Sequence, residues 1–333
     1  MSSAAAPGSG RRGLSDRPGL STRVPDDGRG RDADSPIEIP PRGWLDVLKR
    51  VFTQLREDNI PILAAAVAFY LFLSLIPTLA ASIALYGLVS TPDEVTRTIR
   101  DLTVGLPPAA RDLVVAQATE IASKEASALS VGFLVSVAAA LFSASRGTQA
   151  LVKALNIAYN ERETRRMVKL RLLSLGLTLG IALVVLGGVT VVVKVGNVAE
   201  GLPGGGPVVT ALRWPMLGAI LVGVLAVLYR VSPDRNDPKW RWTTPGALLA
   251  AVLIALASLA LSIYTSRFSD QGESGVLGAV GVLLLWLFAC AYMILLGAEL
   301  DSELEHQTAM DSTVEPDEPL GQRRAVVADH VAP

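Results

Sequence analysis

Four polar side chains recur at four-residue steps within the first long apolar stretch of the chain: Tyr70, Ser74, Thr78 and Ser82. Steps of four keep residues near one face of a helix, so the sequence predicts a polar stripe there. Hydroxyl groups often donate to carbonyl oxygens of their own helix, which would make the stripe structural. The alternative is that the stripe lines a cavity in which the hydroxyl groups contact a solute.

Two charged residues stand where other apolar stretches end. Arg146 follows the stretch 126–145, and Glu299 follows the stretch 274–298. Small residues precede both, and small residues let helices approach closely in lipid. One interpretation is that each charge extends separately to water. The other is that Arg146 and Glu299 form an ion pair that joins the inner ends of two helices as an inner gate or a structural clasp.

Three glycines, Gly275, Gly278 and Gly281, recur every three residues at the start of the last apolar stretch. This spacing predicts a face for close helix packing. A path for a solute along that face is the alternative.

The residues needed for common hydrolytic and metal chemistry are missing from the apolar part of the sequence. The two histidines, His306 and His330, both lie in the C-terminal polar region, and Cys290 is the single cysteine. A histidine-based metal centre, a cysteine metal cluster and a serine–histidine triad are therefore excluded there. We expect no enzyme, no cofactor and no metal.

The apolar stretches define the class of protein. Half of the 333 residues are hydrophobic and only 18% are charged, whereas soluble domains carry about 25% charged residues. Five uncharged runs reach the length of about 20 residues that a helix needs to cross a bilayer. With a shorter sixth run, the sequence predicts an all-α polytopic membrane protein with six transmembrane helices, over 60–89, 129–145, 172–193, 214–229, 242–266 and 274–298.

The flanking regions differ from this membrane domain in composition. Residues 1–43 lack aromatic residues and are rich in charge, glycine, proline and serine, so we expect a disordered cytoplasmic tail. The six-helix domain then extends over 44–305, and residues 306–333 are expected to form a second disordered cytoplasmic tail. Apolar residues at helical spacing after Trp44 and between 91 and 126 predict amphipathic surface helices.

Basic residues near the predicted helix ends indicate the orientation. Fifteen lysine and arginine residues lie on the side of the two termini and seven on the opposite side. Because short cytoplasmic loops carry the excess of positive charge, both termini are expected in the cytoplasm.

Several segments together resemble the YihY/virulence factor BrkB family. They cover roughly residues 44–305 in the family's order: Asp58 to Pro77, FSASRGTQALVKALNIAYN at 142–160, the segment from Pro233 to Gly246, Gly275 to Val280, Trp286, and Gly297 to Leu300. Ser274 and Asp301 depart from the family pattern of tyrosine and asparagine. The resemblance implies a bacterial inner-membrane protein, with links to virulence or serum resistance and to export or lipid-linked transport. It supplies no catalytic residues.

These observations lead to two hypotheses from different classes. The first is an exporter or flippase for a hydrophobic or amphipathic solute, with membrane lipids as neighbours. The second is a structural or scaffolding membrane protein that transports nothing. Members of the family are often labelled ribonuclease BN, but a nuclease is the weakest hypothesis because the metal-binding residues are missing. The net charge of −1 gives no reason to expect nucleic acid, and the oligomeric state stays open.

Overall fold

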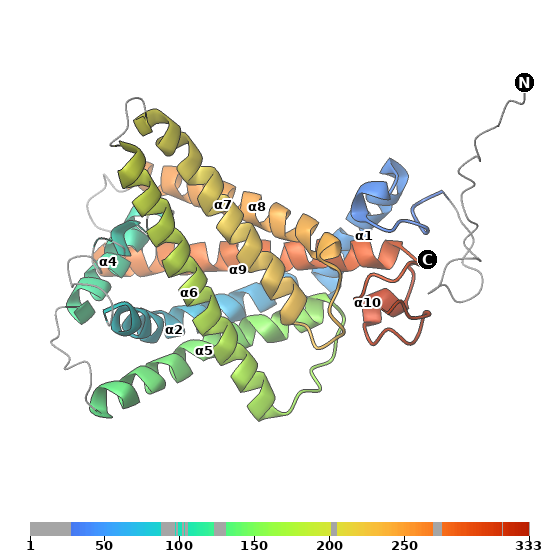
Figure 1. Cartoon of the computed structure of the whole chain (residues 1–333), viewed down its shortest axis with the longest axis horizontal. Helices are drawn as coiled ribbons and strands as arrows, with labels where there is room; N and C mark the ends of the chain where they lie inside the picture. The colour runs from blue at the N-terminus through green and yellow to red at the C-terminus, as the bar shows by residue number, and fades with distance from the viewer. Residues whose placement is uncertain are drawn as a thin grey trace, which may run out of the picture.

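The described part of the protein is built from helices. The computed structural model describes residues 28–87, 97, 99–101, 103, 106–122, 131–200, 205–268, 275–314 and 316–332. Within them lie a short 3-10 helix, η2, and nine α-helices (Figure 1), whose bounds are η2 Pro36–Glu38, α1 Pro41–Glu57, α2 Ile60–Gly87, α4 Pro108–Ala122, α5 Val131–Ala158, α6 Met167–Glu200, α7 Gly205–Val231, α8 Trp240–Phe268, α9 Gly275–Gln307 and α10 Val326–Asp329.

Six long helices, α2 and α5 to α9, cross the molecule from one end to the other (Figure 1). Five of them contain stretches long and apolar enough to span a membrane: Ile60–Leu79, Met167–Val192, Trp214–Val231, Trp240–Ser266 and Gly278–Gln307. The all-α polytopic prediction is confirmed. The sixth helix, α5, carries Arg146 and Lys153 in its second half, and the number of six spans stays a prediction.

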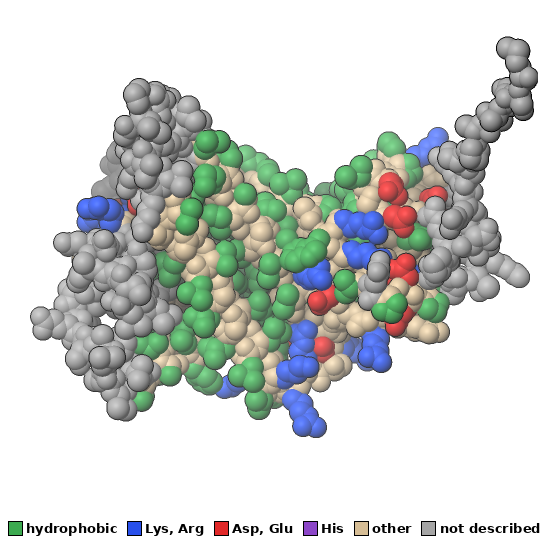
Figure 2. All heavy atoms as spheres, viewed as in Figure 1, with side chains coloured by type: hydrophobic (Ala, Val, Ile, Leu, Met, Phe, Trp, Pro, Cys, Tyr) green, Lys and Arg blue, Asp and Glu red, His purple; other side chains and the backbone are tan. Residues whose placement is uncertain are grey.

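The long helices α6 and α9 extend beyond the predicted apolar stretches. Both do so at the end of the bundle where most of the charged side chains among the described residues lie. α6 begins five residues earlier, at Met167, and α9 continues to Gln307 through a stretch of acidic residues. α1, α10 and the loops at 159–166 and 232–239 gather at this end, which we call the charged end (Figures 1 and 2). On α9, Glu303 and Glu305 continue the helix in ion pairs with Arg50 and Arg235.

Large apolar side chains cover the outside of the bundle between its two ends (Figure 2). On α8, Leu248, Val252, Leu256, Leu259 and Ile263 are each about half exposed and recur at three- and four-residue steps. An apolar surface of this extent is costly in water and is suited to lipid. Its position supports the assignment of the long helices to the membrane.

α1 is the amphipathic surface helix that the sequence predicts. Val47, Val51 and Leu55 are buried against the bundle, whereas Leu45 and Phe52 are more than half exposed. Such a helix can lie along the membrane boundary with its second apolar side toward lipid.

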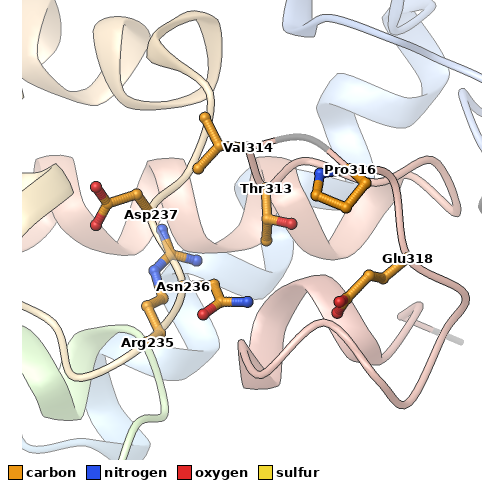
Figure 3. A pocket seen from close by; sticks show the side chains of 7 residues that line it. All are labelled: Arg235, Asn236, Asp237, Thr313, Val314, Pro316 and Glu318. Carbon is orange, nitrogen blue, oxygen red and sulfur yellow. The ribbon is translucent and has the colours of Figure 1, made fainter.

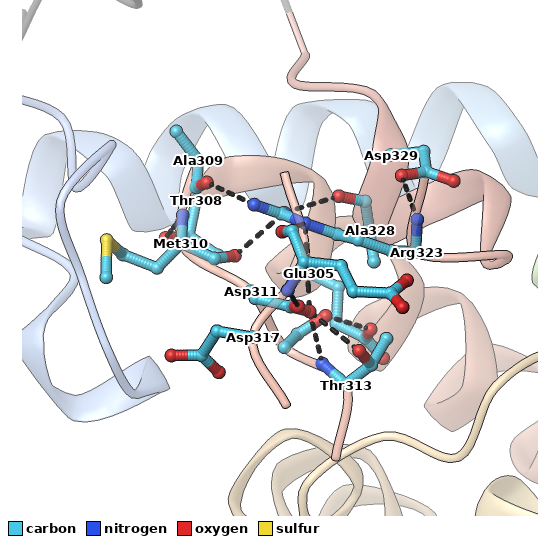
Figure 4. Close-up of polar contacts among 12 residues, drawn as sticks. Glu305, Thr308, Ala309, Met310, Asp311, Thr313, Asp317, Arg323, Ala328 and Asp329 are labelled. Carbon is cyan, nitrogen blue, oxygen red and sulfur yellow. Dashed lines mark hydrogen bonds and ion pairs between the residues drawn. The ribbon is translucent and has the colours of Figure 1, made fainter. Parts of the chain in front are cut away.

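The C-terminal segment differs from the disordered tail that we expected. Residues 308–332 fold around Arg323, whose side chain is fully buried (Figure 4). Its guanidinium donates to the carbonyl oxygens of Glu318, Met310, Ala328 and Ala309 at 2.7–3.2 Å. The segment has little apolar periodicity, and hydrogen bonds from one arginine to the backbone hold it instead.

The described residues before α1, 28–40, also contact the rest of the protein. The Ala309 amide donates to the Arg31 carbonyl oxygen at 2.8 Å, and the Thr308 hydroxyl donates to the Ala33 carbonyl oxygen at 2.6 Å. The ordered domain is therefore wider at both ends than the predicted 44–305. The rest of the predicted N-terminal tail, 1–27, lies outside the described residues.

Close helix contacts occur at glycines other than the predicted three. A Cβ atom at Gly246 of α8 would collide with the backbone carbonyl oxygen of Gly297 of α9, and one at Gly297 would collide with that of Gly246. A Cβ atom at Gly147 of α5 would likewise collide with the side chain of Ser74 on α2. These three glycines allow the helices to approach closely.

A Cβ atom at Gly281 would meet no described atom within 4 Å, so the structure gives no close helix contact there and the packing role of Gly281 stays a prediction. Gly278 is partly exposed. The structure does not describe the surroundings of Gly275. The three-residue spacing indicated a small face but not whether another helix covers it.

Candidate functional site: a hydroxyl-lined cavity and a buried acidic segment

A cavity of about 450 Å³ lies among the long helices, within the range of about 300–1,000 Å³ for small-molecule sites. Apolar side chains form most of its wall. They come from α2, α4, α5, α6, α7, α9 and residue 99: Leu71, Leu79, Ile99, Val114, Ala144, Leu151, Ile181, Ala182, Val185, Leu186, Leu221, Val224, Leu225, Leu228 and Ile294. None of the described residues that line the cavity is charged.

Five hydroxyl groups interrupt this apolar wall: Ser74, Thr78, Thr103, Thr148 and Thr178. Four of them donate to backbone carbonyl oxygens three or four residues earlier in the chain, at 2.6–2.9 Å. The donor–acceptor pairs are Ser74 to Leu71, Thr78 to Ser74, Thr103 to Ile99, and Thr178 to Ser174.

The fifth hydroxyl is also engaged. The Thr148 oxygen lies 2.7 Å from the Thr178 oxygen. A hydroxyl has one hydrogen, and that of Thr178 is directed to Ser174, so Thr148 donates to Thr178. The five groups therefore offer the cavity oxygen lone pairs but no free donor.

The predicted polar stripe is thus divided by the structure. Ser74 and Thr78 line the cavity and also bond to their own helix, so both interpretations of the stripe apply to them. Tyr70 does not line it. Its side chain is 45% exposed and packs edge-on against Phe69 on the outside, because each step of four advances the side chain by about 40° around the helix. The side chain of Ser82 lies outside the described ones.

A second cluster of interest is the α9 acidic segment, which consists of Glu299, Asp301, Glu303 and Glu305. All four residues are buried. An alternating spacing on a helix directs side chains to different sides, so each carboxyl group faces a different element.

Two members of the acidic segment have contacts to α8 and α1. The Asp301 carboxylate accepts the backbone N–H of Gly246 on α8 at 2.7 Å. Arg50 of α1 donates to the Glu303 carboxylate at 2.5 Å and to the Gln307 side chain at 2.7 Å. These contacts join α9 to both helices at the charged end.

Arg235 and Glu305 form a bidentate ion pair in which both side chains are fully buried. The two hydrogen bonds measure 2.8 and 3.0 Å. The guanidinium also lies 4.3 Å from the ring centre of Tyr159, and the Ser312 hydroxyl donates to Glu305 at 2.7 Å. Although burial opposes ionisation, the adjacent Glu305 carboxylate raises the pKa of Arg235 above its ordinary value. The pair joins the α7–α8 loop, α5, α9 and the C-terminal segment.

The predicted pair of Arg146 and Glu299 is not formed. Arg146 is exposed, whereas Glu299 is fully buried and neither of its carboxyl oxygens has a hydrogen-bond partner among the described residues. The reason lies in the helix α5 itself. Gly147 faces α2, and the neighbouring residue Arg146 is therefore directed about 100° away from that contact.

A polar hollow of about 370 Å³ lies between the α7–α8 loop and the C-terminal segment (Figure 3). The backbones pair there, since the Lys239 amide donates to the Ser312 carbonyl oxygen at 2.7 Å. The guanidinium of Arg235 already holds Glu305. We regard this hollow as part of the packing of the C-terminal segment. Among the described residues no group of three or more His, Cys, Asp or Glu is placed to hold a metal ion.

The arrangement of apolar helices around this cavity can be compared with known proteins. The family model described as virulence factor BrkB matches residues 51–320. The chain belongs to the BrkB family. The resemblance seen in the sequence is confirmed, and the protein is an integral membrane protein of a bacterial family.

Relatives in the BrkB family are similar over most of the chain. "Putative ribonuclease-like protein YfkH" of Bacillus subtilis is 28% identical over 78% of this chain and 95% of its own length. A UPF0761 membrane protein of Idiomarina loihiensis is 28% identical over 78% of this chain and 91% of its own. A UPF0761 membrane protein of Rhodospirillum centenum is 26% identical over 85% of this chain and 63% of its own. No solved structure matches the chain.

Sequence reasoning missed most of the residues that organise these two sites. Thr148 lies just beyond the apolar stretch 126–145, and Thr178 follows Ser174 by a single step of four, so neither belongs to a repeat as long as that at 70–82. Of the acidic segment the sequence singles out only Glu299, because it directly follows an apolar stretch, whereas Asp301, Glu303 and Glu305 lie beyond that stretch. Four acidic residues at alternating positions in the sequence AELDSELEH were the available signal.

Proposed function

We propose that this BrkB-family protein binds an uncharged amphipathic solute in the central cavity and moves it across the membrane. The cavity carries the proposal. It has the volume of a small-molecule site, an apolar wall and five hydroxyl oxygens, and its lining comes from four or more helices. A site between separate helices can change shape when the helices shift.

The chemistry of the lining limits the solute. Among the described residues no cation lines the cavity to offset the cost of burying an anionic headgroup. The hydroxyl oxygens accept hydrogen bonds, and their hydrogens are already used within the protein. An apolar chain with a neutral donor, such as a hydroxyl or an amide group, fits these groups best.

Lipid exposure in proteoliposomes tests this function. The probes are a fluorescently labelled glycosyl diacylglycerol, which is neutral and rich in hydroxyl donors, and an equally labelled phosphatidylglycerol, which is anionic. We expect the protein to accelerate transfer of the neutral probe between leaflets several-fold and that of the anionic probe little or not at all. A pH gradient of either sign is included so that a coupled process is detected.

Two variants of α5 provide the matched comparison. Ala144→Leu places a larger side chain in the cavity wall, whereas Ala138→Leu makes the same change at an exposed position. The first variant should lose the acceleration and the second should retain it. If no condition gives acceleration while the protein isolates as a stable complex with other proteins, the structural or scaffolding alternative replaces transport.

We also propose that the charged end faces the cytoplasm of a bacterial cell, supported by the excess of basic residues on that side. After Cys290→Ala, single cysteines are introduced at three exposed positions: Ile37, Gln322 and Asp112. An impermeant thiol reagent applied to intact cells should label only the cysteine at position 112. Labelling at position 37 or 322, with none at 112, would reverse the orientation.

A further inference from the structure

Two carboxyl groups meet where the junction of α1 and α2 packs against α9. Asp58 follows the last residue of α1, and Glu299 lies on α9. Glu299 is fully buried, and its two oxygens and the Oδ2 atom of Asp58 are buried without a donor from another described group. The two side chains lie within hydrogen-bonding reach of each other. Two ionised carboxylates contain acceptors only, so this contact becomes a hydrogen bond when one of them carries a proton.

Among the described residues, the surrounding charges leave the pair without a cation. On α1, exposed Glu57 adds negative charge, and Arg50 is engaged with Glu303. On α9, His306 lies 3.5 Å from the other oxygen of Glu303.

The remaining neighbouring helices add no positive charge to the pair. At the same level α8 contributes the backbone N–H of Gly246, which Asp301 accepts. Arg146 and Lys153 of α5 are exposed. No described basic side chain is therefore available to the two carboxyl groups. A proton can supply the positive charge, because two oxygens can share it without a third ligand.

A metal ion fits the site less well. Hard cations take six or more oxygen ligands, and the described residues place no group of three or more suitable side chains together. A proton needs only two oxygens. Asp58 is half-buried, whereas Glu299 has no exposed surface.

We propose that Asp58 and Glu299 form a binding site for a single proton that the two carboxyl groups share. The bound proton holds the α1–α2 junction against α9. Its release leaves two carboxylates facing each other in a buried position, and their repulsion separates the junction from α9. This inference goes beyond the proposed function and holds whether or not the cavity carries a solute.

The titration of Asp58 agrees with this arrangement. Burial raises its pKa above the ordinary value, and the negative charges of Glu57 and Glu303 act in the same direction, against the hydrogen bond with Glu299. A carboxyl group with a higher pKa in the folded protein binds its proton more tightly when folded. Its contribution to stability is complete below the ordinary pKa of about 4 and is lost as the pH rises through the folded value.

Infrared difference spectroscopy of the full chain in nanodiscs detects the proton directly. The unaltered protein is expected to show the C=O stretch of a protonated carboxyl group at about pH 7, far above the ordinary range of carboxyl groups. Glu299→Gln, which keeps the shape of the protonated side chain, should abolish that band. Glu57→Gln is the matched control, since this residue is the exposed carboxyl next to Asp58, and it should leave the band unchanged.

Thermal unfolding provides the second measurement. Between about pH 5 and about pH 9 the midpoint of the unaltered protein and of Glu57→Gln should fall, whereas that of Glu299→Gln should change much less. A protein without the band at about pH 7 would overturn the proposal, as would an unchanged pH dependence in Glu299→Gln. If Glu299→Gln does not fold, Glu299→Asp replaces it: a shift in the frequency of the band assigns the band to position 299, whereas an unshifted band, which the fully buried Asp301 could give, overturns the proposal. A midpoint that depends on sodium, compared with choline at equal ionic strength, would make the site a cation site instead.

Discussion

Replacing either Arg235 or Glu305 alone is expected to lower the free energy of unfolding by about 3–5 kcal/mol, because the remaining partner would be a buried and unpaired charge. Both side chains are fully buried, and the pair joins four parts of the charged end. The double variant Arg235→Met/Glu305→Leu removes both charges together. It should be clearly more stable than either single variant.

The measurement is denaturant-induced unfolding in detergent micelles for the two single variants, Arg235→Met and Glu305→Leu, and for the double variant. Arg29→Met is the control, because Arg29 pairs with Asp46 at the surface and is 52% exposed; exposed pairs contribute about 0–1 kcal/mol. If the double variant loses as much free energy of unfolding as the two single variants lose together, the two residues do not form a coupled buried pair.

The second large effect is expected at the crossing of α8 and α9. Gly246→Ala introduces a methyl group that collides with the backbone carbonyl oxygen of Gly297 and with the Asp301 carboxylate. Backbone atoms of two long helices cannot yield as a flexible side chain can. We expect a loss of about 3 kcal/mol, at the upper end of the cost of overpacking.

Gly281→Ala on α9 separates this steric effect from the general preference of helices for alanine. No described atom lies within 4 Å of the added methyl group there, so the change should be at most about 1 kcal/mol and favourable. Thermal unfolding midpoints of the two variants give the comparison. Equal midpoints would mean that α8 and α9 are not in the close contact described.

The sequence predicts the long helices well because uncharged runs of 20 residues leave few alternatives to a membrane helix. It predicts their ends poorly. α9 continues for nine residues beyond Ala298 because Asp301, Glu303 and Glu305 each find a partner on another element. Those partners, Gly246, Arg50 and Arg235, are distant in the chain, and no local pattern indicates the pairing.

The candidate site could be predicted only in part for a related reason. Ser74 and Thr78 are recognisable because they repeat on one helix, whereas Thr148 and Thr178 become neighbours only when α5 packs against α6. Arg323 illustrates the same limit in the C-terminal segment. An arginine in a polar sequence suggests an exposed residue, but its donors bind backbone carbonyl oxygens, which carry no sequence signal.

Mass spectrometry of the molecules that remain bound after gentle purification tests the central claim most directly, because it asks whether the cavity holds a solute. The protein is compared with Ala144→Leu, which narrows the cavity, and with Ala138→Leu, which alters the exposed side of the same helix. We predict that an uncharged amphipathic molecule with a hydroxyl or amide group is retained by the unaltered protein and by Ala138→Leu and is lost from Ala144→Leu. Equal retention by all three proteins, or retention of anionic lipids alone, would contradict a solute site in this cavity.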